Sequence, residues 1–138
     1  MGSRSAGEVK GRQKGEGSRL ASFRHAFRGI GVLIGSQPNA RIHFLATLGV
    51  MGIGMVVELD RMEWAALALA IALVWVAEGL NTGLEFLADA VSPDHHPLVR
   101  NAKDVAAGAV LVAALGAVVV GGLIFGPRVA GWMDAVLF

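Results

Sequence analysis

An uncharged apolar run over residues 105–125 constrains this chain more than any other feature of its sequence. As a helix, this run would be about 30 Å long, which matches the hydrocarbon core of a lipid bilayer. Two further apolar runs of similar length lie at about residues 39–59 and 64–88. With 54% hydrophobic residues in 138, the chain is too apolar for a soluble domain of its size. We therefore predict an all-α membrane protein with three transmembrane helices.

The segments that flank these spans carry turn and loop residues. Asp60-Arg61-Met62-Glu63 is expected to form a tight polar turn between the first two spans. Residues 91–103 are polar and contain Pro93 and Pro97, which indicates a loop before the third span. Gly126-Pro127 is expected to end the third helix. Residues 127–138 are then expected to form a tail at the membrane interface, because tryptophan and phenylalanine there suit that environment.

The first part of the chain divides into a leader and a helix. Residues 1–17 are mainly Gly, Ser, Lys, Arg and Glu, which is typical of a disordered basic leader. Over residues 18–35, apolar side chains recur every three or four positions, with Arg24, His25 and Arg28 on the opposite side. This pattern predicts an amphipathic helix that lies on the membrane surface. Pro38 is well placed to start the first span after a short turn.

Charge is distributed unevenly, although the formal net charge is only +1. With three spans, the start of the chain and the loop at 91–103 lie on the same side of the membrane. That side carries ten of the twelve basic residues, and basic residues favour the cytoplasmic side. We therefore expect a multi-pass plasma-membrane protein. The basic leader has no aromatic residue before Phe23, so we expect no nucleic-acid partner. The ten basic residues on the expected cytoplasmic side are Arg4, Lys10, Arg12, Lys14, Arg19, Arg24, Arg28, Arg41, Arg100 and Lys103.

Polar side chains interrupt the second span on one face. At about 100° per residue, Glu78, Asn81, Thr82, Glu85 and Asp89 lie along one side of a helix. An ionised carboxylate at the centre of a membrane helix costs at least ~2.5–3.5 kcal/mol. Snorkelling at a helix end would explain Glu85, but Glu78 lies two turns deeper. Because three helices alone scarcely shield two carboxylates from lipid, we expect a homo-oligomer, with glycines such as Gly49 and Gly108 permitting close helix packing.

These polar residues gather with others near one membrane surface. Carboxylates, an amide and a lysine are suited to hold Mg²⁺ and a polyphosphate. The same carboxylates would also suit a small proton-coupled transporter that uses Glu78 as its proton carrier, and a non-catalytic membrane scaffold is a third possibility. The absence of Cys excludes a cysteine nucleophile and a thiolate zinc site. The cluster comprises Gln37, Glu78, Asn81, Glu85, Asp89, Asp94, His95, His96, Lys103 and Asp104.

Several of these residues form a recognisable pattern. Glu78-Gly-Leu-Asn81-Thr-Gly-Leu-Glu85, followed by Asp89, His96-Pro97 and Ala102-Lys103-Asp104, resembles the small bacterial integral-membrane diacylglycerol kinase family, which includes undecaprenol kinase. The resemblance covers residues 18–126 as one membrane lipid kinase domain. It implies a homotrimer with active sites shared between subunits at the cytoplasmic face, and transfer of phosphate from ATP, with Mg²⁺, to a membrane lipid. Undecaprenol and diacylglycerol both remain open as the acceptor.

The resemblance also implies roles for individual residues. Glu78 matches the general base that contacts the lipid hydroxyl, Asn81 would orient the hydroxyl or the γ-phosphate, and Glu85 matches a ligand of the Mg²⁺ that accompanies ATP. Nucleotide contacts are implied for His25, Asp94, His95, His96, Lys103 and Asp104, although His95 and His96 also fit a plain polar loop. Gln37 stands where many members carry a second metal-binding Glu. Either one metal suffices, or Gln37 contacts phosphate directly.

Overall fold

The computed structural model describes residues 17–92 and 96–137, with side chains from residue 21 onward, so most of the predicted leader lies outside it. The described residues form four helices and no strand: α1 (Gly17–Ser36), α2 (Pro38–Val56), α3 (Arg61–Val91) and α4 (Pro97–Leu137). By length and composition, α2, α3 and α4 are each able to cross a membrane. The prediction of an all-helical chain with three spans is therefore confirmed for this part of the chain.

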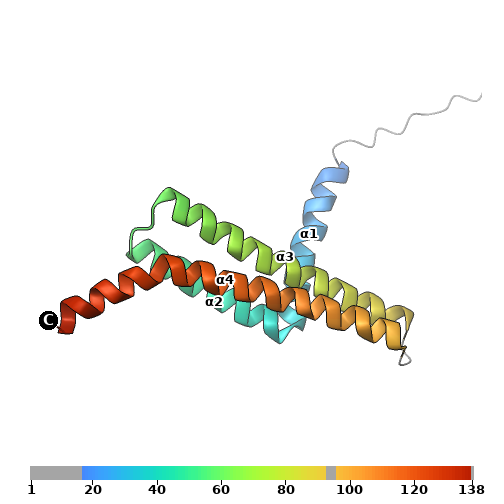
Figure 1. Cartoon of the computed structure of the whole chain (residues 1–138). Helices are drawn as coiled ribbons and strands as arrows, with labels where there is room; N and C mark the ends of the chain where they lie inside the picture. Colours follow the sequence, from blue (N-terminus) through green and yellow to red (C-terminus); the bar gives the residue numbers. More distant parts are fainter. Residues whose placement is uncertain (1–16, 93–95, 138) are drawn as a thin grey trace, which may run out of the picture.

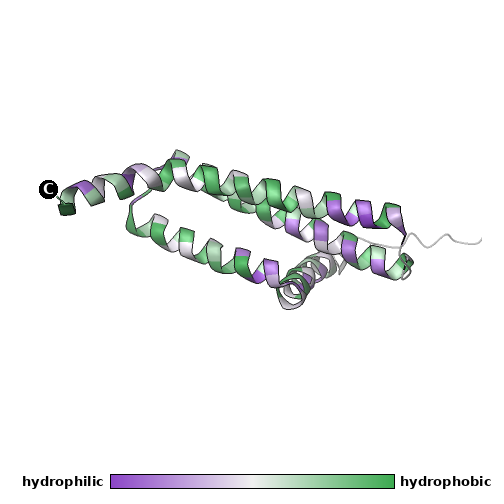
Figure 2. Ribbon diagram, turned by 60° about the horizontal axis from the view of Figure 1, so that its bottom comes forward, coloured by the Kyte–Doolittle hydropathy of each residue, from purple (hydrophilic) through white to green (hydrophobic). Residues whose placement is uncertain are grey.

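Helices α3 and α4 run side by side in opposite directions, and α2 lies along them more loosely (Figures 1 and 2). Helix α1 leaves this group at a steep angle (Figure 1). Phe23 and Phe27, on its apolar side, are exposed, and so are its basic residues, so the described residues leave both sides of α1 uncovered before Leu33. That α1 lies on a membrane surface therefore stays a prediction.

The corner between α1 and α2 is held by the side chain of Arg41. Its Nε donates to the Ile34 carbonyl at 3.1 Å and its Nη2 to the Gly35 carbonyl at 2.6 Å, which satisfies carbonyls that the end of α1 leaves without partners. Pro38 starts α2 as predicted. Leu33 is buried near this corner, close to Gly79 of α3. The corner is thereby fixed against the part of α3 that carries the polar face.

The turn between α2 and α3 lies three residues earlier than predicted, at residues 57–60 instead of 60–63. Helix α2 ends at Val56, and Glu58 takes a left-handed conformation with φ of 54°. The Leu59 amide donates back to the Gly54 carbonyl at 3.4 Å, as in a Schellman motif. Asp60 then caps α3: its side chain accepts from the amides of Met62 and Glu63, and the Glu63 side chain accepts from the Asp60 amide. Residues 61–63 therefore belong to the helix, because this capping box favours helix formation over a turn.

Helix α4 extends beyond its predicted limits at both ends. It begins at Pro97, so most of the expected loop at 91–103 is helical, because proline is well tolerated in the first turn of a helix. The helix also does not end at Gly126-Pro127 but continues to Leu137. A proline removes only its own amide donor and bends a helix that is otherwise stable, and α4 changes direction toward its end (Figure 1). Both boundary predictions were wrong.

The apolar core of the single chain is small and lies at the Leu59 end of the molecule. Leu59, Leu67 and Ile124 form its buried cluster, with Trp64 among the residues packed against it. A Cβ built on Gly54 would lie 2.9 Å from Leu59 Cδ1 and 3.0 Å from Trp64 Cη2, so this close contact between α2 and the start of α3 requires glycine. Most large apolar side chains on the spans are exposed, as expected for helices that face lipid or other subunits.

Gly54→Ala tests this close contact. The added methyl group should cost roughly 1–3 kcal/mol of stability by overpacking against Leu59 and Trp64. The control is Gly52→Ala on the same helix, where nothing lies within 4 Å of the new Cβ; it should be neutral or stabilising. Thermal unfolding of both variants in one detergent measures the difference. Equal midpoints for the two variants would contradict the predicted contact.

Candidate active site

The polar face of α3, formed by Glu78, Asn81, Thr82, Glu85 and Asp89, is buried most deeply at its centre. Glu78 is 1% exposed, Thr82 3% and Asn81 8%, whereas Glu85 is half-buried and Asp89 is exposed. Glu78 is the largest fully buried side chain in the described part of the chain. The most buried position of this face is therefore occupied by a carboxyl group rather than by an apolar residue, which is typical of a functional site in a membrane helix.

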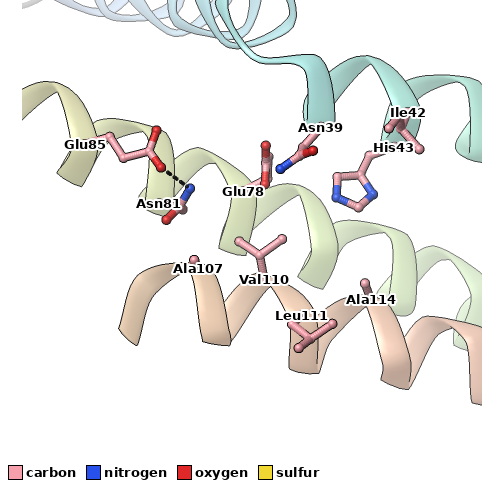
Figure 3. A pocket seen from close by; sticks show the side chains of 10 residues that line it. All are labelled: Asn39, Ile42, His43, Glu78, Asn81, Glu85, Ala107, Val110, Leu111 and Ala114. Atoms are coloured by element: carbon pink, nitrogen blue, oxygen red, sulfur yellow. Dashed lines mark hydrogen bonds between the residues drawn. The ribbon is translucent and has the colours of Figure 1, made fainter. Parts of the chain in front are cut away.

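A pocket of about 310 Å³ opens beside this face. Figure 3 shows the carboxyl group of Glu78 opposite Asn39 of α2, with Val110 below it on α4. The lining combines polar residues of α2 and α3 with small and apolar residues of α4, which suits a ligand that is partly polar and partly apolar. The lining residues are Asn39, Ile42, His43, Glu78, Asn81, Glu85, Ala107, Val110, Leu111 and Ala114.

Two amide groups hold the carboxylate of Glu85. Gln37 Nε2 donates to Glu85 Oε2 and Asn81 Nδ2 donates to Glu85 Oε1, each at 3.1 Å. Gln37 occupies the N-cap of α2, yet its side chain does not cap that helix. It contacts α3 instead and so joins the α1–α2 corner to the polar face. Gln37 and Glu85 were both predicted as site residues, and the structure brings them together.

Three buried polar atoms in this region have no hydrogen-bond partner among the residues that the structure describes. They are Glu78 Oε2, Asn81 Oδ1 and Thr82 Oγ1. An unsatisfied buried polar group costs about 1–3 kcal/mol, and more when it is charged. Such atoms need a specific explanation, and a ligand, ion or second subunit that completes them would give one.

Lys103 lies just beyond the pocket, on the same face of α4 as the lining residue Ala107 four positions later. Its Nζ contacts Asp89 Oδ1 at 2.9 Å. Asp104 Oδ2 lies 3.9 Å from Arg100 Nε, and both of these side chains are largely exposed. Lys103 therefore extends the polar face of α3 toward the loop end of the bundle, with Asp89 as its counter-ion.

Among the described residues, the two predicted histidines His25 and His96 lie away from the pocket. His25 is exposed on α1 and does not line the pocket. His96 is exposed, and its Nδ1 accepts from the Leu98 amide at 3.2 Å in the first turn of α4. Asp94 and His95 lie outside the described residues. Nucleotide contacts for these four residues stay predictions.

Two pocket residues have no role in the pattern that the sequence indicated. Asn39 and His43 both line the pocket from α2. They stand four residues apart and therefore share a face of that helix. A polar pair at this spacing on one face of a membrane span is a signal that sequence analysis could have used. What the sequence could not show is that this face meets the polar face of α3.

The residues around Glu85 fit a magnesium ion only in part. No group of three or more His, Asp and Glu side chains suited to a metal occurs in the described residues. Mg²⁺ is, however, usually held by one or two carboxylates together with waters and substrate phosphates. Glu85 fits that arrangement, in which the nucleotide supplies the missing ligands. Gln37 would have to turn its amide group to offer an oxygen ligand, because its nitrogen faces Glu85 in the structure.

The chain is similar to a known protein family over most of its length. A family model described as prokaryotic diacylglycerol kinase matches residues 24–125. The chain belongs to the prokaryotic diacylglycerol kinase family. The matched range contains Gln37, Glu78, Asn81, Glu85 and Lys103. The resemblance that the sequence motifs indicated is therefore confirmed, and so is the predicted class of enzyme, a lipid kinase.

Individual relatives within the family carry two different names. A diacylglycerol kinase of Synechocystis sp. is 41% identical over 115 residues, which cover 83% of this chain and 66% of the relative. An undecaprenol kinase of Bacillus subtilis is 41% identical over 107 residues, which cover 78% of this chain and 87% of the relative. A diacylglycerol kinase of Pseudomonas aeruginosa is 32% identical over 97 residues, covering 70% and 73%. Equal identity to differently named relatives leaves the lipid acceptor open.

Gln37→Glu tests whether this position takes part in metal binding. The variant places a second carboxylate beside Glu85, so its thermal midpoint should fall without divalent cations and recover with Mg²⁺. At a Mg²⁺ concentration ten times its Kd, binding should raise the free energy of unfolding of the variant by about 1.4 kcal/mol. Gln37→Met is the control: it keeps the chain length without an oxygen ligand and should respond to Mg²⁺ no more than the parent. Equal Mg²⁺ responses in the two variants would contradict a metal role.

Proposed function

We propose that this chain transfers the γ-phosphoryl group of ATP to the hydroxyl group of a membrane lipid, undecaprenol or diacylglycerol. The observation that carries this proposal is Glu78, almost fully buried at the pocket with one carboxyl oxygen unpartnered. Family membership supports phosphoryl transfer over the alternative of a proton-coupled transporter, because the relatives are named as kinases.

Glu78 acts as the general base in this proposal. It accepts the proton of the lipid hydroxyl while the oxygen of that hydroxyl attacks the γ-phosphorus, and the bond to the leaving ADP oxygen breaks. Asn81 lies one turn from both Glu78 and Glu85 and donates to Glu85, so it is placed to orient the two reactants. Positioning and charge neutralisation contribute most of the catalysis in phosphoryl transfer, and such a fixed polar row supplies both.

The nucleotide binds toward the loop end of the same face. Glu85 stands two turns from Glu78, about 10 Å along the helix axis, and with Gln37 it would hold the Mg²⁺ that accompanies ATP. Bound there, the ion would neutralise phosphate charge. Lys103 then exchanges Asp89 for phosphate oxygens of the nucleotide. This exchange is easy because an exposed ion pair such as Lys103–Asp89 contributes little to stability. The nucleotide contacts expected of His25, Asp94, His95, His96 and Asp104 belong to this end.

The lipid reaches the pocket from its apolar side. Ile42 and Leu111 line the pocket and are 64% and 60% exposed on the outside of the bundle. Both acceptor lipids combine a single hydroxyl with apolar chains, so the hydroxyl would enter toward Glu78 while the chains remain among lipid tails. Phosphate transfer from radiolabelled ATP into undecaprenol and diacylglycerol, presented side by side, identifies the acceptor.

The active form is a homotrimer with shared sites. The unpartnered atoms of Glu78, Asn81 and Thr82, the exposed apolar side chains and the isolation of His25 all support additional subunits around the pocket. A Cβ added to Gly49 or Gly108 would meet nothing within 4 Å, which leaves the surfaces of these glycines free for close packing between copies. The excess of basic residues at the pocket end places the site at the cytoplasmic face in this proposal.

Substitutions of Glu78 and Glu85 should have different effects on turnover and on nucleotide binding. Glu78→Gln removes the base and keeps the side-chain volume, so turnover should fall by roughly 10²–10⁴-fold while Mg-ATP still binds. Glu85→Gln removes a charged ligand, so Mg-ATP affinity should fall by about tenfold or more, together with turnover. Turnover and nucleotide binding are measured in the same bilayers.

The control for these variants is Glu58→Gln in the exposed turn before α3, which removes one negative charge far along the chain from the pocket. It should keep the parent's turnover and binding. Near-normal phosphorylation by Glu78→Gln would refute its role as general base. Unchanged Mg-ATP affinity in Glu85→Gln would refute its role as ligand.

Topology gives a separate test. Because the sequence contains no cysteine, Arg61→Cys and Asn101→Cys can be labelled without background. A membrane-impermeant maleimide added outside intact cells should modify position 61 and leave position 101 unmodified. The reverse pattern would place the pocket at the outer face.

A further inference from the structure

Helix α4 is about twice as long as the hydrocarbon core of a membrane is thick. Its 41 residues correspond to about 60 Å, against about 30 Å for the hydrocarbon core. The uncharged stretch between Asp104 and Arg128 is by itself long enough to cross that core, at about 35 Å. Residues 129–137 therefore lie beyond the core, on the side opposite to the pocket and Lys103.

An ion pair marks the place where α4 leaves the core. Arg128 Nη1 and Nη2 donate to the two carboxylate oxygens of Glu63 at 2.8 and 2.7 Å. Arg128 Nη1 also donates to the Ile124 carbonyl at 2.6 Å, on the turn before Pro127. Glu63 in turn accepts from the Asp60 amide in the capping box of α3. The first turn of α3 is thus tied to α4 at the bend, and both charges are only partly exposed.

Beyond this pair, α4 carries an apolar stripe that nothing in the described part of the chain covers. The stripe comprises Val129, Trp132, Met133, Val136 and Leu137, which are 54%, 67%, 48%, 63% and 68% exposed. Their spacing of three and four residues places them on one side of the helix, and Gly131 and Asp134 lie on the other. Past Pro127 the helix runs on beyond the turn between α2 and α3 in both views (Figures 1 and 2).

We propose that residues 129–137 lie along the membrane surface opposite to the pocket, with this stripe buried at the boundary between lipid headgroups and acyl chains. The helix has just crossed that boundary at Arg128, so the boundary is the apolar medium that it can reach without a further partner. The bend at Pro127 turns the last part of α4 away from the axis of the span (Figure 1), and the Glu63–Arg128 pair would fix the depth at which it turns. Tryptophan is also favoured at this level of a bilayer.

The chemistry of the stripe indicates what kind of lipid it recognises. Residues 129–137 contain one charge, that of Asp134, and no basic residue. Their binding therefore depends on apolar area and not on anionic headgroups, unlike that expected of α1 with Arg24 and Arg28. The segment should bind equally well to zwitterionic and to moderately anionic bilayers.

Spin labels on single cysteines test this placement in the full chain reconstituted in bilayers. Each of positions 129–137 is labelled in turn, and collision rates with oxygen and with a water-soluble nickel chelate are measured. Oxygen rates at 132, 133 and 136 should be severalfold above those at 131 and 134, and nickel rates should show the opposite order. Arg61→Cys provides the aqueous reference. The profile should be the same in phosphatidylcholine and in phosphatidylcholine with phosphatidylglycerol.

Two other profiles would overturn the proposal. High nickel rates at all nine positions would mean that the segment projects into water. Low rates for both reagents at 132, 133 and 136 would mean that another copy of the chain covers the stripe. Pro127→Ala should straighten α4 and raise the nickel rates at 132 and 136 severalfold, and an unchanged profile would show that the bend does not orient the segment.

Discussion

The arrangement of this protein depends on the need to keep a carboxyl group inside an apolar helix bundle. Glu78 is almost fully buried on α3, although each buried polar atom without a partner costs stability. Helix α4 covers one side of the polar face with small and apolar residues, and α2 supplies Asn39 and His43 on another. One chain satisfies only part of this face. The remaining unpartnered atoms mark where a ligand or another subunit would complete it.

Charged side chains have different partners at the two ends of the bundle. At the pocket end, Glu85 is held by two neutral amides and Lys103 by an exposed carboxylate, so these charges remain available to a highly charged ligand. At the other end, Glu63 and Arg128 make a two-pronged ion pair that also includes the capping box of α3. A geometry of this kind stabilises more than an ordinary surface pair. The charges at the pocket end are thus held by fewer charged partners than those at the other end.

Most of the fold and the centre of the site could be predicted from the sequence because they depend on local patterns. Apolar length indicated three spans, and the spacing of Glu78, Asn81 and Glu85 indicated a shared helix face. Helix ends were less predictable. Pro127 bends α4 without ending it, and Pro97 begins α4 where a loop was expected, because the effect of a proline depends on which turn of the helix contains it.

The sequence by itself determined the helical class, the three apolar lengths and the types of residue on the polar face, since each follows from composition and from the period of a helix. Only the tertiary structure decided which groups meet across helices. Gln37 contacts Glu85 across 48 positions of sequence, and Arg128 contacts Glu63 across 65. Such contacts depend on how α1 and α2 turn at Arg41 and on how closely α2, α3 and α4 approach one another. Helical periodicity carries no information about either distance, because it fixes a residue's direction around its own axis and not the position of the neighbouring helix.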